Sequence, residues 1–385
     1  MGSSRKIQMM KIVIDDKIPF IRGVFEPYAE VVYLPGKDTV TEVVRDADAL
    51  ITRTRTICSE SLLKDSAVKV IATATIGFDH IDTVWCEANG IVWENAPGCN
   101  SASVRQWVSS VLVNLCRRHN LRFSDLALGV VGVGNVGSKV AAMAETLGFK
   151  VLRCDPPRAR REGGEGFVTL DEIIAGSDIV TLHVPLLKTG EDATWHLFDK
   201  ERIALMRNNQ ILINSSRGPV VDGGALREAL KARNIRAAVL DVWEGEPQLD
   251  RELIPLLDIT TPHIAGYSAD GKANGTTAAV RTVARTLGIE ALKNWTASGV
   301  PAPAKPLSFD IDGFGKDVET VLQEAIIYTY DVEADSEALR NAPELFEKLR
   351  GDYPVRREAP AFTVTLKNGT PAMAGALKEF GFNIK

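Results

Sequence analysis

The stretch Ala127–Asp155 reads ALGVVGVGNVGSKVAAMAETLGFKVLRCD, and the rest of the chain is organised around it. The apolar run Leu128–Val133 predicts a buried parallel strand. The apolar positions that follow the glycine-rich turn predict a helix that ends at Gly148. A second apolar strand, Lys150–Cys154, then ends at Asp155. This order of strand, turn, helix and strand predicts the start of a Rossmann-type doubly wound parallel sheet.

The turn carries the spacing G-x-G-x-x-G at Gly132, Gly134 and Gly137. The first glycine permits a tight turn, the second lets the backbone approach a pyrophosphate, and the third lets helix and strand pack closely. The start of the helix adds N–H donors and a partial positive charge. Asp155 lies about twenty residues further on, where a carboxylate can accept from a ribose hydroxyl. The alternative is a glycine-rich turn of another α/β protein, but the full context favours dinucleotide binding.

Length and composition limit the other functions open to the chain. Its 385 residues suggest two or three domains, with 45% hydrophobic and 25% charged residues and a net charge of −5. This charge leaves no basic surface typical of nucleic-acid binding. The apolar run Trp107–Cys116 is too short to span a membrane. Met1–Met10 is polar and basic, so we expect no secretory signal there, but either a natural or a vector-derived extension.

Five cysteines are scattered without C-x-x-C spacing. This pattern is typical of a reducing cytoplasm and predicts no zinc site or other metal centre.

Alternating strand and helix patterns divide the chain into three predicted domains. Residues 10–100 and 275–295 are expected to form a flavodoxin-like α/β substrate domain, and residues 101–274 the dinucleotide-binding domain. A long helix over 101–119 connects them. A Pro/Ala-rich linker over 296–308 precedes a small α/β unit that ends at residue 385. That unit carries no nucleophile or metal cluster, so we expect it to associate subunits.

The second domain contains four further strand patterns, at residues 178–183, 211–214, 237–241 and 259–263. Ligands of open parallel sheets bind at the carboxyl ends of the strands. Topology should therefore bring the residues that follow these strands to one edge: Asp155, His183, Arg217, Asp241 and His263.

Arg217, Glu246 and His263 are the residues most suited to chemistry at that edge. A histidine can take the hydroxyl proton of a 2-hydroxy acid as its carbon gives up a hydride. A carboxylate beside the imidazole favours its protonated form, and a guanidinium can hold the substrate carboxylate. Taken singly, the three residues are equally compatible with a structural histidine, a loop charge and a turn residue. Their convergence beside a dinucleotide turn favours hydride transfer.

Three longer blocks then support a family resemblance. They read NSSRGPVVD over 214–222, LDVWEGEP over 240–247 and TPHIAG over 261–266. These blocks resemble the signatures of the D-isomer-specific 2-hydroxyacid dehydrogenases. The resemblance implies that Arg217 binds the substrate carboxylate and that Glu246 partners the acid/base His263. Formate dehydrogenases of the same superfamily carry Gln where Glu246 stands, which makes that branch a poor match.

A narrower resemblance, to the erythronate-4-phosphate dehydrogenase family, covers nearly the whole chain from Met10. It rests on TATIGFDH over 73–80, APGCN over 96–100, CDPPR over 154–158, HIAGY over 263–267 and the arginine-rich tail. It implies NAD-dependent oxidation of 4-phospho-D-erythronate at C2 in pyridoxal 5′-phosphate synthesis. It also implies a C-terminal dimerisation domain, and hence a homodimer.

The same resemblance implies the binding residues. Substrate is expected at Thr54, Thr75 and Tyr267. NAD is expected at Gly132, Gly134, Asn135, Val136, Gly137, Asp155, Val184, Ser215, Ser216, Arg217, Asp241 and Gly266. Two positions depart from the family pattern, Thr54 for an expected Ser and Val184 for an expected Thr. Val184 would have to contact NAD through its backbone or an apolar face.

The residues that hold the substrate phosphate stay open at this point. Arg53 and Arg55 near a strand end are candidates, with an exposed strand end as the alternative. Arg350, Arg356 and Arg357 could reach a site across a dimer, although structural ion pairs are the simpler interpretation.

Asp155 favours NAD over NADP because it would repel a 2′-phosphate. The nearby Arg158, Arg160 and Arg161 leave NADP open.

Two other functions compete with this interpretation. Another enzyme of the superfamily, such as a phosphoglycerate dehydrogenase, would usually carry a βαββαβ tail, and the segment after Ser308 has too few strand patterns for one. An NAD-sensing binding protein could retain Arg217, Glu246 and His263, but no peptide-binding element is evident. A purely structural role does not explain the full set of residues.

Overall fold

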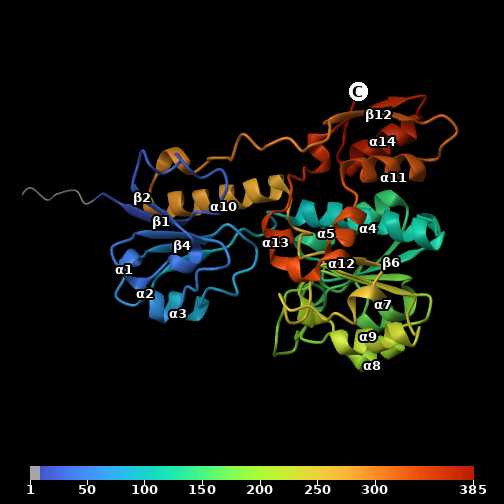
Figure 1. The fold of residues 1–385 in the computed structure, drawn as a ribbon, viewed down its shortest axis with the longest axis horizontal. Helices are drawn as coiled ribbons and strands as arrows, with labels where there is room; N and C mark the ends of the chain where they lie inside the picture. Colours follow the sequence, from blue (N-terminus) through green and yellow to red (C-terminus); the bar gives the residue numbers. More distant parts are fainter. Residues whose placement is uncertain (1–8) are drawn as a thin grey trace, which may run out of the picture. The chain divides into compact units, whose positions relative to one another are not determined.

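The computed structural model of the chain describes residues 9–385, so predictions about residues 1–8 lie outside it. The described chain forms two compact units (Figure 1). The first contains the chain up to Asn100 together with Ser268–Pro301. The second contains Ser101–Tyr267 and Ala302–Lys385. Three parallel sheets lie within these units, which confirms the predicted α/β class.

The first unit is built on a five-stranded parallel sheet of order β2-β1-β3-β4-β5, the flavodoxin-like arrangement. Along β1, Ile12 and Ile14 face a core shared with helix α10, whereas Val13 faces the opposite core. This alternation is why the strands are apolar throughout. The strands are β1 (Lys11–Asp15), β2 (Glu30–Leu34), β3 (Ala49–Thr52), β4 (Val70–Thr73) and β5 (Val92–Glu94), and the helices are α1 (Thr41–Val44), α2 (Glu60–Leu63), α3 (Thr83–Ala88) and α10 (Ala269–Leu287).

The second unit is built on a six-stranded parallel sheet of order β11-β10-β9-β8-β6-β7. The chain passes from β6 to β7 on one side and then crosses to β8 on the other. The carboxyl end of β6 is therefore a topological switch point, where such sheets bind ligands. The strands are β6 (Ala127–Val131), β7 (Lys150–Cys154), β8 (Ile179–Leu182), β9 (Ile211–Asn214), β10 (Ala237–Leu240) and β11 (Ile259–Thr260).

Helices cover both faces of this sheet. Apolar residues of α4 and α5 share one core with Leu128 and Val130 of β6, while α7, α8 and α9 contribute to the core on the other face. The helices are α4 (Ser101–His119), α5 (Asn135–Leu147), α6 (Pro156–Glu162), α7 (Leu170–Gly176), α8 (Lys200–Leu205) and α9 (Gly223–Lys231).

The C-terminal segment adds a three-stranded parallel sheet of order β12-β13-β14. Helices α11 and α14 carry Leu322 and Leu377 into the core of α4 and α5. Leu339 of α12 and Phe346 of α13 enter the core on the opposite face of the large sheet. The elements are β12 (Ser308–Asp312), α11 (Val318–Thr329), α12 (Glu333–Asn341), α13 (Phe346–Gly351), β13 (Thr363–Lys367), α14 (Pro371–Phe380) and β14 (Asn383–Ile384).

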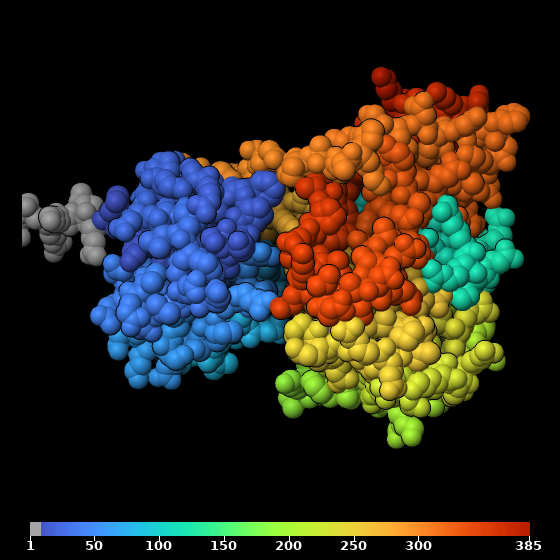
Figure 2. Space-filling model, viewed as in Figure 1, coloured from blue at the N-terminus to red at the C-terminus, as the bar shows by residue number. Residues whose placement is uncertain are grey.

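This segment belongs to the same compact unit as residues 101–267, whereas our division into domains placed residues 296–385 apart. Figure 2 shows it, coloured orange to red, lying directly on the rest of that unit. The shared cores explain the grouping, since the segment buries apolar side chains against both faces of the large sheet. The three-domain division stays a prediction.

Candidate active site

The glycine-rich turn after β6 fits only glycine at two of its positions. Gly132 has a φ of +83°, and a Cβ there would lie 2.7 Å from the carbonyl oxygen of His183. A Cβ on Gly137 would lie 1.9 Å from the carbonyl oxygen of Gly132. Because glycine has no Cβ at these two positions, helix α5 can start directly against the end of β6.

Gly134 has a different environment, because a Cβ there would meet no atom within 4 Å. It is the N-cap of α5, and no side chain caps the helix. The N–H groups of Asn135 and Val136 therefore face an open approach at the positive end of a helix dipole, as anion binding requires. Val184 lies beside the turn, with its Cγ1 2.8 Å from the position of a Cβ on Gly132.

Asp155 connects the end of β7 to this turn. Its carboxylate accepts from the backbone N–H of Val133 at 2.8 Å and from that of Arg158 at 3.0 Å. The nearby arginines already pair with carboxylates of the chain: Arg158 with Glu162 at 2.7 Å, Arg160 with Asp192 at 2.5 Å and Arg161 with Glu162 at 3.1 Å. This pairing makes them poor partners for a 2′-phosphate, which supports the expected preference for NAD.

The turn after β9 is held by the side chain of Asn214. Its Nδ2 donates to the carbonyl of Arg217 at 2.9 Å, and its Oδ1 accepts from the N–H and hydroxyl of Ser216. Arg217 donates back to the carbonyl of Ser216 at 2.8 Å. Within residues 9–385, the buried hydroxyl of Ser215 has no hydrogen-bond partner. Such a group is satisfied by a polar ligand, so the residues here fit the expected dinucleotide.

Asp241, at the end of β10, holds the turn that carries His263. Its carboxylate accepts from the Thr261 hydroxyl at 2.6 Å and from the N–H groups of Ile264 and Ala265 at 2.8 and 3.0 Å. Its own carbonyl accepts from the N–H of His263 at 2.7 Å. His263 has a φ of +56°, a left-handed conformation that is uncommon for a side-chain-bearing residue. Asp241 is only 1% exposed, and its hydrogen bonds to Ile264 and Ala265 keep the turn in this conformation.

His263 and Glu246 form a hydrogen-bonded pair, with Nδ1 of the imidazole 2.8 Å from Oε2 of the carboxylate. The second oxygen of Glu246 accepts from the N–H of Trp243 at 2.8 Å. Burial alone would raise the pKa of Glu246, but the His263 hydrogen bond, the Trp243 N–H and the positive charge of Arg350 together hold it below its usual range. Glu246 is therefore a carboxylate at neutral pH, and Nε2 of His263 is the nitrogen available to a substrate.

His183, which sequence topology placed at the same edge, is a different kind of histidine. Burial lowers its pKa to about 3, so its imidazole is neutral. Its Nε2 lies 3.0 Å from the hydroxyl of Thr181. Of the two histidines, only His263 has a carboxylate partner that supports acid/base chemistry.

Comparisons with known proteins agree with this geometry. Residues 101–265 match the NAD-binding domain of the D-isomer specific 2-hydroxyacid dehydrogenases, and residues 311–381 match a domain of unknown function. The chain is 48% identical over 359 residues to an erythronate-4-phosphate dehydrogenase of Bacteroides fragilis, covering 93% of this chain and 99% of that protein. The chain belongs to the erythronate-4-phosphate dehydrogenase family.

Another member of this family, from Proteus mirabilis, is 40% identical over 377 residues, covering 97% of this chain and 99% of that protein. Among solved structures, the D-lactate dehydrogenase of Aquifex aeolicus in complex with NAD and lactic acid is 26% identical, with a TM-score of 0.60. The match covers 76% of this chain and all of that protein. The chain is thus an NAD-dependent dehydrogenase with a Rossmann-type cofactor domain, as the sequence predicted.

Residues 311–381, which match the domain of unknown function, contain a supporting residue whose contact the sequence did not predict. Arg356 is 5% exposed and donates to the carbonyls of Ile264 and Ala265, at 3.1 and 2.6 Å, directly after His263. Its guanidinium lies 4.5 Å from the ring centroid of Tyr330. We expected Arg356 either in an ion pair or at a site across a dimer. It supports the His263 turn of its own chain instead, and no sequence spacing signals that contact.

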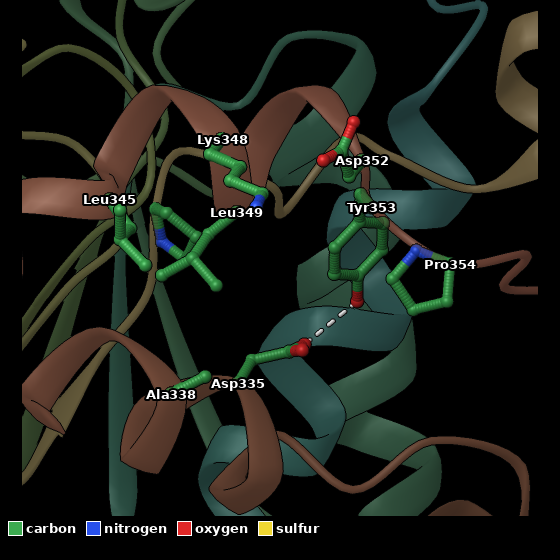
Figure 3. Close-up of a pocket in the computed structure, with 9 residues that line it drawn as sticks. Asp335, Ala338, Leu345, Lys348, Leu349, Asp352, Tyr353 and Pro354 are labelled. Atoms are coloured by element: carbon green, nitrogen blue, oxygen red, sulfur yellow. Dashed lines mark hydrogen bonds between the residues drawn. The ribbon is translucent and has the colours of Figure 1, made fainter. Parts of the chain in front are cut away.

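Asp335 lies beside this arginine and accepts from the hydroxyls of Tyr330 and Tyr353, both at 2.7 Å. Burial raises the pKa of Asp335, although both tyrosine hydroxyls and Arg356 oppose the shift. Figure 3 shows the Tyr353 hydroxyl pointing to the Asp335 carboxylate. Both residues line a cavity of about 250 Å³. Pro262, next to His263, lines this cavity too, so the segment packs directly behind the turn.

The predicted substrate residues of the first unit lie at the carboxyl ends of two paired strands. Thr54 is exposed directly after β3, and Thr75 follows β4 with its hydroxyl 2.8 Å from that of Thr73. Thr73 also donates to the carbonyl of Arg53, which links the two strand ends. In the second unit, Gly266 lies within a turn closed by a bond from the Tyr267 N–H to the Ile264 carbonyl.

Residues 9–385 contain neither a membrane-spanning helix nor a cluster of metal ligands. No helix there is both long and apolar enough to cross a membrane. Nor does that part of the chain bring together three His, Cys, Asp or Glu side chains able to hold a metal ion.

Proposed function

We propose that this chain oxidises the C2 hydroxyl of 4-phospho-D-erythronate with NAD⁺, giving (R)-3-hydroxy-2-oxo-4-phosphooxybutanoate in pyridoxal 5′-phosphate (vitamin B6) biosynthesis. The relatives that carry the name erythronate-4-phosphate dehydrogenase match the chain over nearly its whole length. The observation that carries the proposal is the 2.8 Å pair of His263 and Glu246 in the same unit as the glycine-rich turn.

In this proposal His263 is the general base. Nδ1 is occupied by Glu246, so Nε2 takes the proton of the C2 hydroxyl. The Glu246 carboxylate stabilises the imidazolium that forms and orients the ring. Arg217 holds the substrate carboxylate in a forked contact, which fixes C2 relative to the base. Bound NAD⁺ supplies the acceptor for the hydride that leaves C2.

The cofactor would be held around the glycine-rich turn, with its pyrophosphate at the N–H groups of Asn135 and Val136. Asp155 would accept from the adenosine ribose, and the Ser215 hydroxyl would gain the partner that it lacks within residues 9–385. Thr54, Thr75 and Tyr267 are proposed to bind the substrate.

We also propose that the protein acts in the cytoplasm as a homodimer formed through residues 296–385. Phe314 of that segment is 81% exposed, and a partner subunit could cover such an apolar side chain. We further propose that residues 10–100 and 275–295 form the substrate domain and that residues 101–274 form the NAD-binding domain.

An assay of the purified protein tests this function directly. 4-Phospho-D-erythronate and 3-phosphoglycerate are each supplied with NAD⁺ or NADP⁺, and the formation of reduced cofactor is followed. We expect the highest kcat/KM with 4-phospho-D-erythronate and NAD⁺. A higher kcat/KM for 3-phosphoglycerate would assign the chain to another enzyme of the superfamily, and NAD binding without turnover of either acid would favour a sensing role.

A further inference from the structure

Arg350 of the C-terminal segment lies beside the predicted substrate residue Tyr267. The guanidinium of Arg350, on α13, is 5.5 Å from the centroid of the Tyr267 ring. Tyr267 follows His263 by only four residues, in the turn described above. Helix α13 is fixed in place by Phe346, which is buried in the core under the large sheet. The position of Arg350 is therefore set by packing within the same unit as the His263–Glu246 pair.

Arg350 lacks a direct charged partner in the described part of the chain. Within residues 9–385 the structure shows no ion pair for Arg350, and its buried Nε has no acceptor. Two other arginines of the segment differ, since Arg340 donates to the carbonyls of Ile254, Leu257 and Asp258 and Arg356 to those of Ile264 and Ala265. A buried donor without a partner is costly, so a ligand oxygen is the natural complement for Arg350.

Arg350 is also close enough to Glu246 for its positive charge to help lower the pKa of that carboxylate. Glu246 in turn contacts His263. The unpaired cation is thus near the reacting end of the site as well as near Tyr267.

The proposed substrate has two anionic groups. Its carboxylate adjoins C2, where Arg217 is expected to hold it, and its phosphate lies at the far end of a four-carbon chain. A phosphate offers three strong acceptor oxygens, which suit the parallel N–H groups of a guanidinium. We propose that Arg350 binds the 4-phosphate of the substrate and is the residue that selects a phosphorylated acid, an inference that rests on the proposed function.

In this arrangement Tyr267 has a defined role. The cation–π contact with its ring orients the plane of the guanidinium, while Nε and the adjacent Nη donate to two phosphate oxygens. The C-terminal segment then supplies substrate specificity to its own chain, in addition to any part in association.

The test compares Arg350→Met with wild type on 4-phospho-D-erythronate and on unphosphorylated D-erythronate. Lys348→Met is the matched control, because it removes an exposed cation from the same helix. We expect Arg350→Met to lose on the order of 10- to 100-fold in kcat/KM for the phosphorylated acid, mainly through KM, and to change little with D-erythronate. The Lys348→Met enzyme should behave as wild type with both acids.

A second readout does not depend on turnover. Inorganic phosphate should raise the melting temperature of the wild-type NAD complex and of Lys348→Met, but not that of Arg350→Met. If Arg350→Met fails to bind NAD, Arg350→Gln, which retains a polar side chain, replaces it.

Equal losses on both acids with retained stabilisation by phosphate would overturn the proposal and show that Arg350 acts through Glu246. Failure of the proposed function is distinguishable, since wild type would then not prefer 4-phospho-D-erythronate to 3-phosphoglycerate. The phosphate measurement still decides the role of Arg350 in that case.

Discussion

The glycine-rich turn 132–137 and the turn 262–267 that carries His263 follow strands of the same parallel sheet, yet they are stabilised in different ways. The first is held by its own glycines, by Asp155 and by the next strand. The second depends on Asp241 from another strand and on Arg356 from the end of the chain. Asp155 and Asp241 lie at similar distances in sequence from the turns that they hold, 22 and 23 residues from their partners. The difference lies in Arg356, which contacts the turn that carries His263 from 92 residues further along the chain.

This difference has a functional consequence. A turn that binds a cofactor shared by many dehydrogenases needs only backbone geometry, which a short motif can specify. The turn that carries His263, the proposed base, would have to place one imidazole against one substrate. Its strained backbone at His263, with a φ of +56°, persists because surrounding groups determine it.

The largest predicted effect comes from a substitution that removes the proposed base and leaves both turns intact. We expect His263→Asn to lower kcat by roughly 10²–10⁴, because no other group takes the hydroxyl proton. Asparagine is chosen because it tolerates a left-handed backbone better than alanine. Steady-state kinetics measure the loss, and titration with NADH should show unchanged affinity. Turnover like that of wild type would reject His263 as the base.

The second prediction tests whether the C-terminal support matters to the catalytic turn. Arg356→Met removes a buried cation that donates to Ile264 and Ala265, and Asp335 loses its nearby positive charge. We expect the free energy of unfolding to fall by about 3 kcal/mol, as when one partner of a buried charge pair is removed. We also expect a lower kcat with unchanged NAD affinity.

Arg340→Met is the control for this prediction. Arg340 donates to carbonyls of the loop before β11, away from His263. Its loss should reduce stability in chemical denaturation but leave kcat near that of wild type. If both variants lowered kcat equally, the effect on Arg356→Met would be general loosening and not support of the turn.

The third prediction separates the two kinds of glycine in the cofactor turn. A Cβ on Gly137 would lie 1.9 Å from the backbone of Gly132, so Gly137→Ala should destabilise the fold by about 1–3 kcal/mol or more. Gly134→Ala has open space and should fold normally, but its methyl group would obstruct the pyrophosphate and weaken NAD binding by roughly 10-fold. Thermal melts and NADH titration measure the two effects. Normal NAD affinity in Gly134→Ala would place the pyrophosphate elsewhere.

The same contrast explains how much the sequence could predict. Strands β7 and β9 were predicted at their observed bounds, because each is an apolar run between clear breakers. Strand β11 ends at Thr260 and not at His263, because the Asp241 carboxylate binds Thr261 and Ile264 and holds the chain in a turn there. No local pattern signals a turn imposed from another strand.

The C-terminal segment was predicted less completely. Strand β12 lies at a sheet edge and alternates exposed residues with the half-buried Phe309 and the buried Ile311, and its start was assigned to the linker. Helix α12 is rich in acidic residues and buries only Ser336 and Leu339, so its apolar pattern is weak. Arg350 was considered for the substrate phosphate only across a dimer, and the support that Arg356 gives to the His263 turn was not predicted. No spacing rule relates these arginines to a turn about ninety residues earlier.

The smallest predicted effect concerns the Glu246–His263 pair. Glu246 has a pKa below its usual range, so it is charged at neutral pH and stabilises the protonated imidazole. Glu246→Gln removes that charge, and the basic form of His263 then persists to lower pH. The acidic limb of the pH profile of kcat/KM should therefore move to lower pH. Rates measured from pH 5 to 9 test this shift.

Glu244→Gln is the control that makes the result specific. Glu244 pairs with His196 at 2.8 Å, so its loss also breaks a carboxylate–histidine pair, but one that does not contact His263. The acidic limb should not move in that variant. An unmoved limb in Glu246→Gln would mean that Glu246 only orients the imidazole ring. The placement of His263 would then depend mainly on Asp241 and Arg356, which hold the backbone of its turn.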